Sequence, residues 1–434
     1  MNDGPLTIAF MPESAYGPTN NCIGIGKILE QRGHRVVFTS ESSWKGKLEP
    51  HGFEEHLVDQ APPPEDDQPQ SAGQYWADFM AALAPALRTP TIEQLSTVIE
   101  PIFASMLDGA TYCEPQLREI LGRVQPDVIV QDNVAAFPAL LTHGAPWVKI
   151  VSCNPLEMKD PGVAPVFSGY SDDDRTGWEE FRAQYERSLR DTWERFNAFV
   201  VDAGAPPLPD LEFVHESNHL NMYVFPETLD YRRERPLGPT WHRLESSVRE
   251  TEEPFEVPDH LREGPGALVY LSLGTLGSAD VELMRRLVEA FAESPHRFIV
   301  SKGPRADEFD LADNMWGADV LPQTTIIPLC DIVFTHGGNN TTTEAMHFGK
   351  PMVLLPVFWD QHDNAQRVHE LGFGQRLDTY TSTDADLRDA VDGLADDVAL
   401  RERMASIGAT IRANDGKRHA ADLIESVGRS GRDR

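Results

Sequence analysis

A run of glycines and polar residues in the C-terminal half has the composition of an anion-binding turn. Residues 335–344 read THGGNNTTTE and follow residues 331–334, a short apolar run that predicts a buried strand. A helix is expected to follow and to end near Gly349. Glycine lets the backbone approach a ligand, free N–H groups at a helix start favour an anion, and His336 can donate to a phosphate oxygen. The pattern predicts either a diphosphate cradle or an ordinary strand-to-helix turn with a well-capped helix.

A carboxylate and an amide follow the next predicted strand, residues 351–356. Asp360 and Gln361 lie just past its end. Ligands of open α/β sheets bind beyond the carboxyl ends of the strands. A carboxylate beside an amide suits two neighbouring hydroxyls, as on a sugar ring.

The order and spacing of these residues resemble the donor-binding signature of the UDP-glycosyltransferase superfamily (glycosyltransferase family 1). The resemblance is greatest to the bacterial branch that glycosylates macrolides and other natural products, and it spans residues 321–374. It implies an α/β protein of GT-B fold, with two Rossmann-like domains whose parallel sheets face a central cleft. The implied donor-binding residues are Gly274, Thr275, Val320, Leu321, Gln323, His336, Gly338, Asn339, Asn340, Thr341, Glu344, Asp360 and Gln361.

The resemblance also implies roles for some of these residues. The backbone at Val320 and Leu321 would contact the base, although many relatives carry a Trp where this chain has Val320. Glu344 would bind the ribose hydroxyls, and Asp360 with Gln361 would orient the sugar. UDP-glucose is the donor first expected, with inverting transfer that needs neither a metal nor a cofactor.

The N-terminal part departs from the family pattern where the catalytic base is expected. Relatives carry Gly-His-x-Asn-Pro after the first strand, whereas this chain has Pro18 at the His position, between Gly17 and Asn20 of the acceptor loop. Proline cannot transfer a proton. Asp132, which ends a predicted strand, matches the acidic partner of that His and is the favoured base. The alternatives are a histidine from another loop, His215 or His219, or an acceptor acidic enough to need little help.

The chain is expected to divide into two domains and a linker. An acceptor-binding domain takes residues 1–225, with its last strand at 221–225 and a loop at 12–21 after the first strand. Residues 226–265, rich in Pro, Glu and Arg, form the linker. The donor-binding domain takes residues 266–415. A tail takes residues 416–434, frayed from 426, and an aromatic-rich helix is expected over residues 178–203.

Composition narrows the classes of partner. The formal charge of −31 argues against nucleic acid or an anionic membrane surface as the main partner. Four scattered cysteines have neither metal-ligand nor disulfide spacing, which favours reduced thiols in the cytoplasm. The chain shows no secretory signal and no apolar run near the ~20 residues that span a bilayer. A full dinucleotide fingerprint is absent, so a nicotinamide cofactor is not expected.

The sequence therefore predicts transfer of a hexose from a UDP-sugar to a hydroxyl of a lipophilic small molecule. One alternative is a catalytically impaired protein that binds sugar nucleotides, which Pro18 favours. A second is a glycosyltransferase for a lipid acceptor. The acceptor, the choice between UDP and TDP, and the oligomeric state are left open.

Overall fold

The first half of the molecule is built on a parallel sheet. The computed structural model describes residues 4–62 and 83–432. The seven strands of this sheet lie in the order β3-β2-β1-β4-β5-β6-β7. They are β1 (Thr7–Pro12), β2 (Arg35–Glu41), β3 (Glu54–Val58), β4 (Val128–Asp132), β5 (Trp147–Val151), β6 (Leu220–Val224) and β7 (Trp241–Leu244). Its helices are α1 (Tyr16–Gln31), α3 (Thr91–Gln94), α4 (Glu100–Val124), α5 (Pro138–Thr142) and α6 (Trp178–Asp202).

The second half repeats this plan with six parallel strands in the order β10-β9-β8-β11-β12-β13. They are β8 (Leu268–Ser272), β9 (Arg297–Ser301), β10 (Met315–Ala318), β11 (Ile332–Thr335), β12 (Met352–Leu354) and β13 (Gly374–Arg376). The helices are α7 (Asp259–Arg262), α8 (Gly274–Gly277), α9 (Val281–Phe291), α10 (Gln323–Ile326), α11 (Asn339–Phe348), α12 (Gln361–Glu370), α13 (Asp384–Asp396), α14 (Val398–Ala413) and α15 (Gly416–Arg432). Central strands such as β4 and β8 are buried at every residue, as parallel strands covered by helices on both faces require. The predicted GT-B fold class is confirmed.

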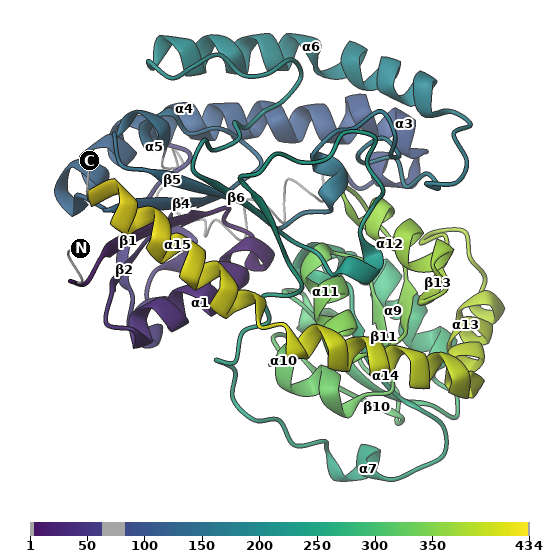
Figure 1. Cartoon of the computed structure of the whole chain (residues 1–434). Helices are drawn as coiled ribbons and strands as arrows, with labels where there is room; N and C mark the ends of the chain where they lie inside the picture. Colours follow the sequence, from purple (N-terminus) through teal and green to yellow (C-terminus); the bar gives the residue numbers. More distant parts are fainter. Residues whose placement is uncertain (1–3, 63–82, 433–434) are drawn as a thin grey trace.

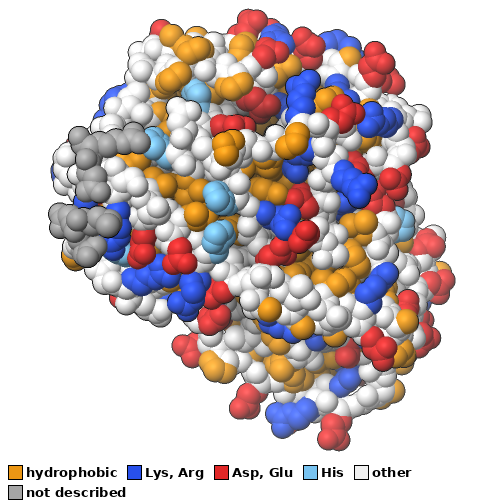
Figure 2. Space-filling view, in the orientation of Figure 1, with side chains coloured by type: hydrophobic (Ala, Val, Ile, Leu, Met, Phe, Trp, Pro, Cys, Tyr) orange, Lys and Arg blue, Asp and Glu red, His pale blue; other side chains and the backbone are white. Residues whose placement is uncertain are grey.

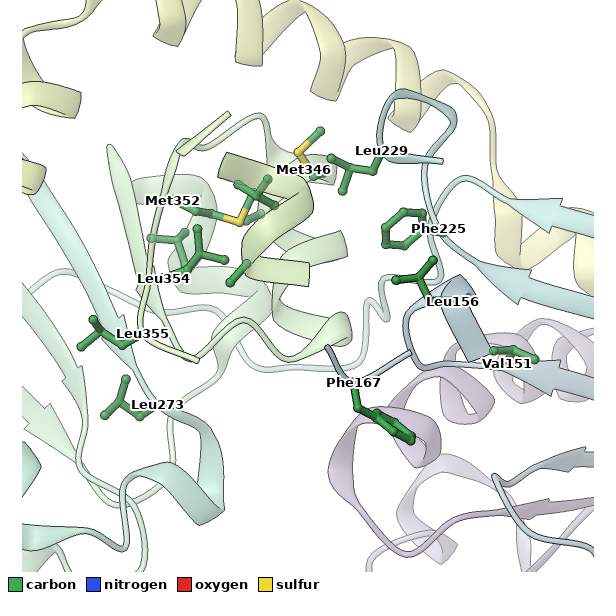
Figure 3. Packing of buried hydrophobic residues seen from close by; sticks show 14 of the residues in the cluster. Val151, Leu156, Phe167, Phe225, Leu229, Leu273, Met346, Met352, Leu354 and Leu355 are labelled. Carbon is green, nitrogen blue, oxygen red and sulfur yellow. The ribbon is translucent and has the colours of Figure 1, made fainter. Parts of the chain in front are cut away.

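A hydrophobic core cluster continues from one half of the molecule into the other. Phe225 and Leu229 come from the first half, and Met346 and Met352 come from the second. Figure 3 shows labelled members of the cluster from both halves. The residues between the two sheets are therefore packed against each other, and the strand ends that carry the predicted site residues face this packed region.

The C-terminal helix α15 returns to the first sheet, and the predicted frayed tail is wrong. Figure 1 shows α15 running from α14 of the second half across to β4 and α1 of the first. Ala420 and Ile424 are fully buried, because an apolar stripe of four-residue spacing faces the sheet. Arg432 closes the helix with an ion pair to Asp127, 2.6 Å long.

Two other expected segments differ in the structure. The last strand of the first sheet is β7, which lies inside the predicted linker. Its four residues show no strand alternation in the sequence, and it is formed by pairing with β6. Helix α1 begins at Tyr16, so Pro18 and Asn20 are helical rather than in a loop. Proline is tolerated there because the first-turn N–H groups have no intrahelical partner.

Candidate active site

His336 lies between two glycines at the ends of neighbouring strands. It follows β11, and α11 begins just after Gly338. A Cβ added at Gly338 would lie 2.5 Å from His336 Nε2, and one added at Gly274, which follows β8, would lie 2.7 Å from His336 Cε1. Gly274 also has φ +67°, which glycine adopts readily. The two glycines leave the space that the imidazole occupies, so the structure brings together His336, Gly338 and Gly274 as predicted.

The start of α11 has the chemistry of an anion site. Its first intrahelical bond runs from Thr342 N–H to the Gly338 carbonyl, 3.0 Å, so the earlier N–H groups have no intrahelical acceptor. No side chain caps them, because the N-cap is Gly338. Burial lowers the pKa of His336 to about 4 and a hydrogen bond to the Ser272 carbonyl opposes that change, so the imidazole is neutral at pH 7 and carries one N–H. Neutral donors and a helix N-terminus together suit a diphosphate.

Glu344 is buried within a network of hydrogen bonds. Its Oε1 accepts from Arg249 Nη1 and from Asn340 Nδ2, both at 2.9 Å, and its Oε2 accepts from Gln323. Gln323 also donates to Thr341 Oγ1 at 3.2 Å. Burial raises the pKa of Glu344, whereas the Arg249 guanidinium opposes that rise. The predicted residues Gln323, Asn340, Thr341 and Glu344 are adjacent, and a ribose hydroxyl at Glu344 would share the carboxylate with these partners.

Arg249 is a buried residue of this network that was not among the predicted site residues. Its guanidinium is buried between Glu344 and Glu252, and Glu252 in turn accepts from Thr324 N–H at 2.6 Å. This segment was predicted as a linker without periodicity. In the sequence, Arg249 is a single arginine among glutamates, and charged segments of this kind usually lie in solvent.

The segment expected to contact the base is open. Val320 is 73 % exposed, which leaves an apolar side chain at the surface beside α10. Its N–H donates to the neighbouring Asp319 carboxylate at 2.9 Å. Thr275 is also exposed, at the start of α8. Leu321 is partly buried against the core.

Asp360 and Gln361 are engaged in protein contacts. Asp360 Oδ2 accepts from the backbone N–H of Asn154, 2.8 Å away in the first half, and burial raises the pKa of Asp360 to about 7. Gln361 Oε1 accepts from the N–H groups of Val357 and Phe358 at 3.0 and 3.2 Å. A sugar at this position would have to replace these bonds.

Asn339 also links the two halves instead of facing an open donor site. Its Nδ2 donates to the carbonyls of Ser152 at 2.9 Å and Val224 at 3.1 Å. These bonds fix the start of α11 against the ends of β5 and β6.

Asp132 lies at the expected strand end but is covered. It is 3 % exposed, and its Oδ2 accepts from Ser152 Oγ at 2.6 Å and lies 3.8 Å from Cys22 Sγ. Asn21 Nδ2 donates to the same Ser152 hydroxyl at 2.9 Å. Burial raises the pKa of Asp132 to about 7. Pro18 and Asn20 lie in the first turns of α1, the helix that also carries Asn21 and Cys22.

The two alternative histidines lie at the wrong edge of the sheet. His215 and His219 precede β6, which begins at Leu220, so both are at the amino end of that strand. His215 Nε2 bonds to the Pro206 carbonyl at 2.8 Å. The donor-side residues lie at the carboxyl ends of the strands, so a histidine base from this loop is not supported.

Aromatic side chains gather beside Asp360. Trp359, at φ +58°, places its ring 5.3 Å from Phe103 and 4.4 Å from Phe167. A small hollow among these rings shares Tyr185 and Lys159 with a larger neighbouring hollow of about 390 Å³. This wall suits an apolar ring system.

Charged groups elsewhere are mixed. Figure 2 shows Lys and Arg side chains interspersed with Asp and Glu side chains over one face. Within residues 4–62 and 83–432, no group of three or more His, Cys, Asp or Glu has a metal-binding arrangement. Among the helices of that same part, none is long and apolar enough to span a bilayer.

Comparisons with known proteins agree with this geometry. Residues 285–420 match the family described as Erythromycin biosynthesis protein CIII-like, C-terminal domain. The chain is 24 % identical to the NDP-glycosyltransferase YjiC of Bacillus subtilis (strain 168), over 95 % of both chains. It is 26 % identical to the oleandomycin glycosyltransferase of Streptomyces antibioticus, over 97 % of this chain and 91 % of that one. The crystal structure of the glycotransferase of kitacinnamycin superposes with a TM-score of 0.70 at 23 % identity, covering 98 % of this chain and 99 % of that chain.

The fold and the matches define a glycosyltransferase of the GT-B class. Within that class, the predicted resemblance to the bacterial macrolide and natural-product branch of glycosyltransferase family 1 is confirmed.

Proposed function

We propose that this enzyme transfers a hexose from a nucleotide diphosphate sugar to a hydroxyl of a lipophilic natural product, with inversion at the anomeric carbon. The observation that carries the donor part is the position of His336, fixed between Gly274 and Gly338 at the uncapped start of α11. UDP-glucose is the donor proposed first. Solved structures of similar fold are complexes with DTDP or thymidine diphosphate, which makes TDP-sugars the direct competitor.

The proposed reaction forms one bond and breaks one. The acceptor oxygen bonds to the anomeric carbon while the bond from that carbon to the diphosphate breaks, and the diphosphate leaves with the electron pair. Negative charge grows on the diphosphate in the transition state. Preorganised N–H donors at α11 and the neutral His336 imidazole would stabilise that charge.

The acceptor class rests on the aromatic wall around Trp359 and on the names of relatives. These include an oleandomycin glycosyltransferase and a zeaxanthin glucosyltransferase, both of which are named for lipophilic acceptors. An acceptor of this kind would be held by ring contacts and apolar burial. We also propose a cytoplasmic location, because all four cysteines are free thiols, as a reducing compartment requires.

Calorimetric titration of UDP and TDP into the protein tests the donor part. His336→Ala is expected to weaken binding about 10- to 150-fold, since a hydrogen bond to a charged group contributes ~1.5–3 kcal/mol. The exposed His369→Ala is the matched control and should bind as the wild type does. Binding of neither nucleotide, or equal binding by His336→Ala, would refute the proposal.

A second candidate function, binding without transfer, is favoured by Pro18 at the position of the family base. Incubation with UDP-glucose or TDP-glucose and a panel of phenols, macrolides and ansamycins separates the two. A donor-dependent gain of one hexose in the acceptor mass supports transfer. Nucleotide binding without product on any acceptor supports the second candidate.

A further inference from the structure

Glu13 lies at the carboxyl end of β1, in the short turn that precedes α1 and Pro18. It follows Pro12, and its N–H donates to the Asp132 carbonyl at 2.7 Å, which extends the pairing of β1 with β4. Its Oε2 accepts from Ala15 N–H at 2.9 Å, which holds the carboxylate beside the start of α1. The residue is partly exposed, unlike Asp132.

The start of α1 meets the start of α11, where the diphosphate is proposed to bind. A Cβ added at Gly17 would lie 3.6 Å from Asn340 Cβ. On the other side, Asn339 Nδ2 reaches the carbonyl of Ser152, whose hydroxyl covers Asp132. Glu13 therefore stands at the edge of the first sheet that faces the donor helix.

Asp132 is a poor direct base in this arrangement. Its Oδ2 accepts from Ser152 Oγ, and the buried Asn21 Nδ2 donates to that hydroxyl. The Asp132 side chain is 3 % exposed, and an acceptor hydroxyl would have to displace Ser152 to reach Oδ2. Asp132 instead orients Ser152, which makes it a positioning residue.

We propose that Glu13 accepts the proton of the acceptor hydroxyl and so replaces the imidazole that Pro18 cannot provide. The proposal rests on the proposed glycosyl transfer. In the step, the acceptor O–H proton moves to a Glu13 carboxylate oxygen as the acceptor oxygen bonds to the anomeric carbon. The diphosphate departs with the electrons of its bond to that carbon, and Glu13 later loses the proton to water.

The electrostatic surroundings of Glu13 favour proton exchange near neutral pH. Although part of the side chain reaches the surface, loss of solvation raises the pKa of Glu13 to about 7, helped by the Glu41 carboxylate at the end of β2 and opposed by the N–H groups of Ala15 and Ser14. The Asp132 carboxyl at the end of β4 is the other acidic group beside it. A base is most effective when its pKa lies near the working pH.

A series of acceptors of graded acidity tests the role of Glu13. Transfer from UDP-glucose and TDP-glucose is measured with 4-nitrophenol, phenol and benzyl alcohol for the wild type, Glu13→Gln, Glu13→Ala, Asp132→Asn and Glu41→Gln. Gln keeps an oxygen that can accept from Ala15 N–H, so the turn before α1 can be retained. Thermal melting and UDP titration check folding and the donor site.

Glu13→Gln is expected to lower kcat by about 10²–10⁴-fold on benzyl alcohol, with a smaller loss on the acidic 4-nitrophenol and unchanged UDP affinity. The acidic limb near pH 7 in the wild-type pH profile should disappear, and formate should restore part of the activity of Glu13→Ala. Asp132→Asn and Glu41→Gln should lose less than tenfold.

Glu13→Gln activity within tenfold of the wild type on benzyl alcohol would overturn the proposal, as would an equal loss across all three acceptors or a larger loss in Asp132→Asn. A wild type that binds UDP but transfers to none of the acceptors would overturn the proposed function and the role of Glu13 together. If the wild type and Glu13→Gln are instead equally active, the role of Glu13 is refuted and the proposed function stands.

Discussion

Gly338→Ala should weaken donor binding through steric displacement of His336. Gly338 has φ −57° and ψ 139°, which alanine adopts without strain, so the backbone of α11 need not change. The added Cβ would lie 2.5 Å from His336 Nε2, closer than unbonded atoms approach. The imidazole must therefore move away from the start of α11.

The size of the effect follows from the hydrogen bond that is lost. A bond from a neutral donor to a charged phosphate contributes about 1.5–3 kcal/mol, so UDP or TDP should bind about 10- to 150-fold more weakly. Gly122→Ala is the matched control, because it lies in α4 with no atom within 4 Å of the added Cβ. The control should bind as the wild type does and be slightly more stable.

Calorimetric titration of the two single variants and of Gly338→Ala/His336→Ala completes a double-mutant cycle. If the alanine acts through the imidazole, the double variant should bind no more weakly than His336→Ala alone. This reasoning would be refuted if Gly338→Ala bound UDP and TDP with an affinity within threefold of the wild type. It would also be refuted if the losses of binding free energy of the two single variants added in the double variant.

Three further predictions concern stability. Arg249→Ala leaves Glu344 buried without its cation, so it should lower the free energy of unfolding by about 3–5 kcal/mol in chemical denaturation. The double variant Arg249→Ala/Glu344→Gln should recover part of that loss. Wild-type stability of Arg249→Ala would contradict a stabilising buried pair. Burial lowers the pKa of His336 from 6.5 to about 4, so the stability that its neutral form contributes is present above pH 6.5 and is lost as the pH falls toward 4. The free energies of unfolding of the wild type and His336→Gln, measured by denaturation, should therefore converge as the pH falls from 6.5 to 4. Above pH 6.5 the difference between them should be constant. Ile424→Ala should cost about 2–5 kcal/mol because its side chain is fully buried under the first sheet, and a change below 0.5 kcal/mol would show that α15 is not needed there.

The structure of the turn around His336, the proposed donor cradle, could be predicted from the sequence because it is local. Strand β11, the glycine turn and the start of α11 are consecutive residues, and each has a composition typical of its structure. The neighbouring contact of Gly274 with His336 follows from the pairing of β8 with β11, which a parallel sheet of this order imposes. The fold class followed from the same repetition of strands and helices.

The parts that could not be predicted depend on residues far apart in the chain. Arg249 meets Glu344 95 positions later, and Asp360 meets Asn154 206 positions earlier. Helix α15 has the periodicity of an amphipathic helix, but nothing in that pattern tells which sheet it will cover. Short strands such as β7 and β13 form because a neighbouring strand offers its edge, and their own residues carry little strand signal.

Polar contacts between the two halves engage Asp360, the proposed sugar-binding carboxylate, with protein groups. Asp360 receives the Asn154 N–H, and Asp363 receives the N–H groups of Phe167 and Gly169 at 2.7 and 2.8 Å. Each of these donors belongs to the loop that follows β5, so α12 and that loop form one seam. If Asp360 binds the hexose as proposed, a hydroxyl that bonds to its Oδ2 must take the place of the Asn154 N–H. Binding of the proposed donor there would therefore be coupled to the arrangement of this loop, which also carries Phe167 beside Trp359.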